Sequence, residues 1–116
     1  MDSISDLQQK QHEFVRSRNW DKFGSPKNLS MALAVEAAEL MQEFMWLSDQ
    51  QIEALPIKYP DRFQNVKEEL ADVFLYLLRI ADTMQIDLIQ AGTEKILKNE
   101  KKHPIEKSLA TAAEFS

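Results

Sequence analysis

The sequence has no cysteine, and it holds only two glycines and four prolines among its 116 residues. The lack of cysteine excludes disulfides, thiolate zinc sites and cysteine nucleophiles. Few glycines and prolines together with 44% apolar residues are typical of helical proteins, because sheet proteins need more turn residues and more β-branched residues. A chain of this length fits a single domain. We therefore predict an all-α fold.

Long apolar runs and an excess of basic charge are also missing. The longest apolar run, residues 73–78, is far too short to span a bilayer, and the polar first 14 residues do not resemble a secretory signal. A formal net charge of −5 lacks the basic bias of a nucleic-acid binder. We expect a soluble, cytoplasmic protein that binds no membrane and forms no stable complex with nucleic acid.

Apolar residues at helical spacing predict four helices, at about residues 3–18, 27–47, 62–85 and 88–103. Ser25 followed by Pro26 is typical of a helix start, and Asp61 and Asp87 are predicted to cap the third and fourth helices. Residues 48–60 hold two prolines, which predicts a loop with one or two helical turns.

These helices are expected to pack as antiparallel neighbours around a four-helix-bundle-type core. Residues 1–104 would form the domain, and residues 105–116, which show little periodicity, a C-terminal tail or arm. Part of the third helix is apolar nearly all round, so it must be covered on several sides. A bundle this small cannot easily cover Phe74, Leu75 and Leu78, which predicts a homodimer or a dimer of dimers.

Two acidic pairs recur in the two long helices. Glu36 and Glu39 stand three residues apart in one, and Glu69 and Asp72 stand three apart in the other. Residues three apart on a helix are neighbours, so each pair puts two carboxylates on one face, beside the apolar stripe. If the helices pack antiparallel through those stripes, the two pairs face each other and four carboxylates surround one small volume.

The surroundings of the pairs favour a cation site over a solvated acidic face. No lysine or arginine occurs in residues 28–47, and the positions one turn from Glu69 and Asp72 also lack one. Four converging carboxylates repel one another and must take up protons or bind divalent cations. Ligands that are all hard oxygen atoms select Mg²⁺, or Mn²⁺ in its place, over zinc and copper.

The acidic pairs lie in a longer pattern, formed with the segments Asn19–Phe23, Pro26–Leu29, Asp72–Tyr76 and Lys98–Pro104. With these flanks the chain resembles the MazG-like all-α nucleoside triphosphate pyrophosphohydrolases, especially the dCTP pyrophosphatase branch, whose hallmark is a Glu-x-x-Glu motif followed by Glu-x-x-Asp. The resemblance implies a tetrameric, Mg²⁺-dependent enzyme that cleaves a nucleoside triphosphate to the monophosphate and pyrophosphate and so cleans the nucleotide pool. The expected substrate is dCTP or a related or modified deoxynucleotide.

The resemblance also implies roles for single residues. Glu36, Glu39, Glu69 and Asp72 would hold the metal and be catalytic, and which of them activates water stays open. The resemblance implies aromatic residues that bind the base and sugar and polar residues that lie near the triphosphate. The implied substrate-binding residues are His12, Trp20, Lys27, Trp46, Tyr76, Lys95, Asn99 and Lys102. A shift of one residue would put Gln11 in the place of His12. Core packing is the alternative for the aromatic side chains, and a solvated face is the alternative for the lysines.

Two other functions compete with this interpretation. A di-iron bundle needs two Glu-x-x-His motifs, and the chain has one, Glu100 to His103, at a helix end. A non-catalytic helical oligomerisation or adaptor module explains the apolar third helix and the tail. It leaves the uncompensated acidic pairs unexplained.

Overall fold

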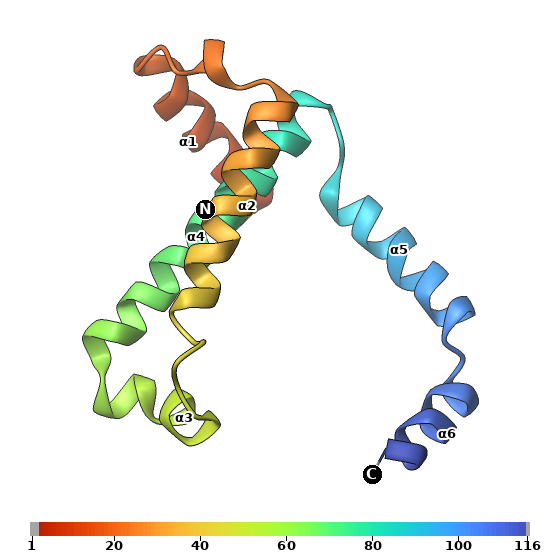
Figure 1. The fold of residues 1–116 in the computed structure, drawn as a ribbon. Helices are drawn as coiled ribbons and strands as arrows, with labels where there is room; N and C mark the ends of the chain where they lie inside the picture. The colour runs from red at the N-terminus through yellow and green to blue at the C-terminus, as the bar shows by residue number, and fades with distance from the viewer. Residues whose placement is uncertain (1–2, 116) are drawn as a thin grey trace. The chain divides into compact units, whose positions relative to one another are not determined.

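The computed structural model describes residues 3–115, with the side chains of residues 3–114. The regular elements of this part of the chain are six α-helices and one 3-10 helix, without a strand (Figure 1). The predicted all-α fold is therefore confirmed. The chain forms two units, which divide between Gln85 and Ile86. No described helix has both the length and the apolarity needed to cross a membrane.

The first unit contains the elements α1 (Ile4–Ser17), η1 (Asp21–Phe23), α2 (Pro26–Gln42), α3 (Asp49–Lys58) and α4 (Pro60–Thr83). Helices α2 and α4 run antiparallel along each other, α3 joins their far ends, and α1 packs against α4 (Figure 1). The expected antiparallel packing of the two long helices is confirmed.

The start of α2 follows the predicted capping pattern. Ser25 Oγ accepts a hydrogen bond from the Asn28 backbone N–H at 3.1 Å, and Pro26 occupies the first helical turn, where a missing N–H costs nothing. The predicted end near residue 47 is wrong, because α2 ends at Gln42. Beyond that residue the chain changes to i→i−3 hydrogen bonds, such as Phe44 N–H to Met41 O at 3.0 Å, which tighten it into turns.

Residues 48–60, predicted as a loop with one or two turns, contain the ten-residue helix α3. A capping box starts it: Ser48 Oγ accepts from the Gln51 N–H at 3.2 Å, and Gln51 Oε1 accepts from the Ser48 N–H at 2.8 Å. Pro56 lies inside the helix near its end, where one lost hydrogen bond is tolerated. Leu55 is buried and fixes α3 to the core.

The start of α4 corrects the prediction for Asp61. Tyr59 holds the N-cap position without a side-chain cap, and Pro60 is the first helical residue. Proline is favoured there because its fixed φ angle suits a helix and its missing N–H would be unbonded in any case. Asp61 lies in the first turn, where its charge suits the positive end of the helix dipole.

The core of the first unit is small. Its buried apolar residues come from all four α-helices of the unit, and they are Val15, Leu29, Leu55, Leu78 and Ala81. The expectation that Leu78 needs another subunit to cover it is wrong, since its exposed fraction is 0%. Helix α1 lies over this part of α4, and Gln8 Nε2 donates to the Leu78 carbonyl at 3.5 Å.

The second unit contains α5 (Leu88–Lys102) and α6 (Ile105–Phe115). Asp87 caps α5 as predicted, with its carboxylate accepting from the Gln90 N–H at 3.0 Å. The segment 105–116, expected as a tail or arm, is helical over most of its length. The predicted division into 1–104 and 105–116 stays a prediction, and residues 1, 2 and 116 lie outside the described residues.

Candidate active site

The acidic pairs converge between the two antiparallel helices. Glu36, on α2, and Glu69 and Asp72, on α4, each offer one carboxylate oxygen, and these three atoms lie within 4.8 Å of one another. Glu39 lies close enough to Glu36 and to Glu69 to raise the pKa of both carboxyl groups. The antiparallel packing therefore brings together the four side chains that the spacing selected. We call them the acidic cluster.

Two oxygen atoms of the acidic cluster are buried without a partner. Glu36 Oε2 and Glu69 Oε2 are shielded from solvent, and neither accepts a hydrogen bond within the described part of the chain. A buried charged oxygen without a partner is costly, and the cost is removed when the group binds a proton or a cation.

The titration of the cluster follows from this environment. Burial is the main cause that raises the pKa of Glu36 from 4.5 to about 7, followed by the hydrogen bond and the charge of Glu39 and by the charges of Asp72 and Glu69. Burial also raises the pKa of Glu69, with further contributions from Glu39, Asp72 and Glu43. In the absence of a cation the cluster therefore tends to hold a proton.

The donor set fits a hard divalent ion. All ligands are carboxylate oxygens, which Mg²⁺ and Mn²⁺ prefer, and the two unpartnered oxygen atoms belong to residues of the cluster. Glu43, which the sequence interpretation left out, also faces Glu69 closely enough to affect its pKa. Its signal was the spacing of three and four residues that puts Glu36, Glu39 and Glu43 on one helical face.

A cavity of about 480 Å³ opens beside the acidic cluster. We call it the aromatic cavity, because Phe14, Trp20 and Tyr76 line it, and Asp72 of the cluster lines it as well. Phe14 and Trp20 meet edge to face, with ring centroids 5.7 Å apart. The structure thus brings the predicted residues Trp20 and Tyr76 together with one predicted metal ligand, over a space that suits a flat ring.

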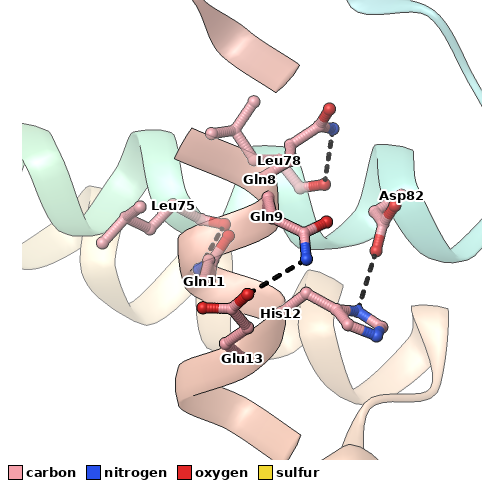
Figure 2. Close-up of polar contacts among 8 residues, drawn as sticks. All are labelled: Gln8, Gln9, Gln11, His12, Glu13, Leu75, Leu78 and Asp82. Carbon is pink, nitrogen blue, oxygen red and sulfur yellow. Dashed lines mark hydrogen bonds and ion pairs between the residues drawn. The ribbon is translucent and has the colours of Figure 1, made fainter. Parts of the chain in front are cut away.

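Helix α1 places Gln11 and His12 differently. Gln11 lines the aromatic cavity, and its Nε2 donates to the Leu75 carbonyl at 3.0 Å (Figure 2). His12 faces Asp82, with 3.6 Å between Nδ1 and Oδ2, and it lines a neighbouring cavity of about 260 Å³ (Figure 2). Of the two candidates for the first-helix position, Gln11 is the one that reaches the aromatic cavity. A substrate role for His12 stays a prediction.

The other predicted substrate residues lie elsewhere. Trp46 follows the end of α2, is 81% exposed and does not line the aromatic cavity. Lys27 is exposed in the first turn of α2. Lys95, Asn99 and Lys102 are spaced four and three residues apart on α5, so they share one exposed face of the second unit. Their roles stay predictions.

Among the aromatic and charged residues that line the aromatic cavity, the sequence interpretation missed Phe14, Lys10 and Arg79. Arg79 had a signal, because it follows Tyr76 by three residues and Asp72 by seven and therefore lies on the same face of α4. Phe14 and Lys10 belong to α1, and their part in the cavity depends on how α1 packs on α4.

Comparisons with known proteins place the chain among similar sequences. The profile of the MazG-like family matches residues 31–116. The chain is 33% identical to dCTP pyrophosphatase 1 of Mus musculus over 115 residues, which is 98% of this chain and 66% of the mouse protein. It is 30% identical to dCTP pyrophosphatase 1 of Homo sapiens, with the same coverage. The chain thus spans about 66% of the length of these relatives.

A solved structure is similar to the fold as well. The crystal structure of a pyrophosphatase from Archaeoglobus fulgidus DSM 4304 superposes with a TM-score of 0.78 and 40% sequence identity, over 87% of this chain and 92% of the archaeal chain. The family profile covers both acidic pairs, and the relatives extend the similarity to nearly the whole sequence. The chain belongs to the MazG-like family.

Proposed function

We propose that the protein is a Mg²⁺-dependent nucleoside triphosphate pyrophosphohydrolase. The observation that carries this proposal is the double position of Asp72, which belongs to the acidic cluster and also lines the aromatic cavity. A cation site for phosphates and a ring-lined space for a base thus share one wall. A nucleotide combines these two chemistries in one molecule.

Glu36, Glu39, Glu69 and Asp72 are the residues that would hold the metal. A divalent ion held by these residues would supply positive charge against the negative charge that develops as the bond to the leaving pyrophosphate breaks. Glu39 is the most suitable residue to orient the attacking water and accept its proton. It is exposed to solvent, and its carboxyl neighbours both Glu36 and Glu69.

The aromatic cavity would bind the base and sugar. Trp20 and Tyr76 would hold the ring through their faces, and Asp72, one turn before Tyr76, would keep the phosphates at the metal end. Relatives at 30 and 33% identity are named dCTP pyrophosphatases, so dCTP or a related or modified deoxynucleotide is the proposed substrate. The products would be the nucleoside monophosphate and pyrophosphate.

The direct test is a panel of deoxynucleoside triphosphates with Mg²⁺, in which the products are identified as well as quantified. The proposal predicts monophosphate and pyrophosphate, with the highest kcat/KM for a cytosine nucleotide. Release of inorganic phosphate would mean that a different bond is cleaved. Absence of any hydrolysis by the folded protein would favour the adaptor function.

A homo-oligomer, a dimer or a dimer of dimers, is part of the proposal. The outer side of α4 carries an apolar groove of about 510 Å³, lined by Leu70, Phe74 and Leu77, whose exposed fractions are 56%, 40% and 40%. Apolar side chains grouped in this way are typical of surfaces that another protein covers. A second copy of the chain is the proposed occupant.

A further inference from the structure

Arg79 lines the aromatic cavity and also the neighbouring cavity of about 260 Å³ that Gly24 and His12 line, so it lies where the two cavities meet, on the side away from the acidic cluster. Asp72, Tyr76 and Arg79 share one face of α4, and seven residues of helix separate Arg79 from Asp72 by about 10 Å along the axis. The Arg79 guanidinium carbon lies 5.9 Å from the centroid of the Tyr76 ring. The guanidinium therefore borders the space beyond the ring that would hold a base.

Gly24 leaves the space that the Arg79 guanidinium occupies. A Cβ atom at Gly24 would lie 3.1 Å from Arg79 Nη2 and 3.2 Å from the Asp21 carbonyl oxygen, closer than ordinary van der Waals contact. The φ angle of Gly24 is −91°, so the backbone conformation does not require glycine here. The steric requirement is the close approach of Arg79.

The guanidinium N–H groups of Arg79 donate no hydrogen bond to other described residues of the first unit. Within the described part of the chain, Arg79 has the contact with Tyr76 but no hydrogen bond or ion pair. A guanidinium has five N–H donors and no acceptor, so it binds atoms that accept hydrogen bonds. A planar donor group beside an aromatic cavity suits the carbonyl oxygens and ring nitrogens of a nucleobase.

Gln11 gives the same end of the cavity a fixed polarity. Its amide contacts the Leu75 carbonyl, which can only accept, so Nε2 must face that carbonyl and Oε1 must point away from it (Figure 2). Gln11 and Arg79 line the aromatic cavity together. Both residues also line the smaller neighbouring cavity, so an oriented amide and a charged donor lie where the two cavities meet.

We propose that Arg79 is a substrate-binding residue that donates hydrogen bonds to acceptor atoms of the nucleobase, and that Gly24 is the positioning residue that makes room for it. This rests on the proposed function, because it takes the cluster end of the cavity as the phosphate end. Asp72 and Tyr76 lie between Arg79 and that end, so the base, not the triphosphate, is what Arg79 contacts.

The test measures ligand binding apart from catalysis. Calorimetry with Mg²⁺ present would compare a panel of deoxynucleoside monophosphates with deoxyribose 5-phosphate, which lacks a base, for the wild type, Arg79→Gln and Arg79→Lys. We expect Arg79→Gln to weaken binding of the preferred monophosphate roughly tenfold or more and to leave deoxyribose 5-phosphate unchanged. Arg79→Lys, which keeps the charge but loses the planar donor set, should fall between the two.

Arg62→Gln is the matched control, because Arg62 is exposed in the first turn of α4, away from the aromatic cavity. This variant should bind all these ligands as the wild type does. Gly24→Ala should weaken binding of the same monophosphate less than Arg79→Gln does. In turnover, both Gly24→Ala and Arg79→Gln should raise KM more than they lower kcat.

Three results would overturn the proposal. The first is equal monophosphate affinity of the wild type and Arg79→Gln, and the second is an equal loss of affinity for deoxyribose 5-phosphate in Arg79→Gln, which would make Arg79 a phosphate contact. The third is a wild type that binds ligands with a base no more tightly than deoxyribose 5-phosphate. A wild type that binds monophosphates through the base but hydrolyses no triphosphate would refute the proposed function alone.

Discussion

Glu36 combines partial burial, a buried oxygen without a partner and three acidic neighbours, and these raise its pKa to about 7. An unfolded chain releases this proton near pH 4.5, whereas the folded protein holds it up to about pH 7. The proton stabilises the folded state fully below the unfolded pKa, and this contribution is lost as the pH rises through the folded pKa.

The metal-free protein should therefore lose stability between about pH 5 and pH 8, by on the order of 1–2 kcal/mol from Glu36 after allowance for solvent screening. Glu36→Gln, which keeps the shape of the protonated side chain without its charge, should remove this part of the decline. Urea unfolding in the presence of a chelator at several pH values measures both proteins. Identical pH profiles would contradict the assigned role of Glu36.

Substitutions in the acidic cluster should also lower the catalytic efficiency. Glu36→Gln and Asp72→Asn should lower kcat/KM by about a hundredfold or more, because each removes charge that would hold the metal against the phosphates. Glu68→Gln is the matched control: Glu68 stands next to Glu69 but points to solvent, where Gln64 Nε2 donates to it at 3.4 Å. Folded variants of Glu36 and Asp72 with full activity would show that the site is assigned wrongly.

The acidic pairs could be predicted because their signal is local. Spacing along one helix fixes which side chains share a face, and the lack of nearby lysine or arginine is visible in the sequence. Phe14 and Gln11 could not be placed in this way, because they meet Tyr76 only through the packing of α1 on α4. For His12 and Gln11, a one-residue uncertainty along α1 decides whether the side chain reaches the aromatic cavity: Gln11 lines both cavities, whereas His12 lines the smaller one and not the aromatic cavity.

The starts of the helices show which local sequence signals are enough to predict where a helix begins. Ser25 and Asp87 are recognisable as caps because each precedes a long apolar stripe, and both accept the capping hydrogen bond. The prediction for Asp61 is wrong because aspartate is a favoured cap residue, but Pro60 one position earlier is better suited to begin the helix. The two prolines of residues 48–60 predict a loop, but Pro56 lies near the end of α3 and Pro60 begins α4, while the capping box and Leu55 favour a helix between them.

The capping box of α3 gives a prediction at the level of one element. Ser48→Ala should destabilise the protein by about 1 kcal/mol, because the Gln51 N–H loses its acceptor. Ser5→Ala, at an exposed position inside α1, should change stability far less. Urea midpoints of the two variants provide the comparison. Equal midpoints for Ser48→Ala and the wild type would mean that this cap does not stabilise the fold.

Considered as a whole, the first unit buries few side chains completely and leaves many large apolar ones in contact with solvent. Leu78 is covered within the chain, as the sequence interpretation did not expect, while Leu70, Phe74 and Leu77 line an exposed groove. The four longer helices and their order along the chain could be predicted, whereas α3 and α6 could not. The distribution of buried and exposed apolar side chains depends on where α1 lies on α4.

Assembly is the prediction at this scale. Phe74→Glu should shift the protein from a dimer or tetramer to a smaller species, because a charge in the apolar groove cannot be buried without a partner. Ile57→Glu is the control, since Ile57 is 88% exposed and lies outside the groove. Light scattering on the eluted peaks determines the masses. A wild-type monomer at micromolar concentration would contradict the predicted assembly.

The convergence of four carboxylates on a divalent ion is tested most directly by the effect of Mg²⁺ on thermal unfolding. Ligand binding to the folded state stabilises it by about 2.7 kcal/mol at a concentration 100 times Kd. If the acidic cluster binds Mg²⁺, we expect a clear rise in Tm with Mg²⁺ for the wild type and Glu68→Gln, and little or none for Glu36→Gln and Asp72→Asn. An equal rise in all four proteins would contradict it.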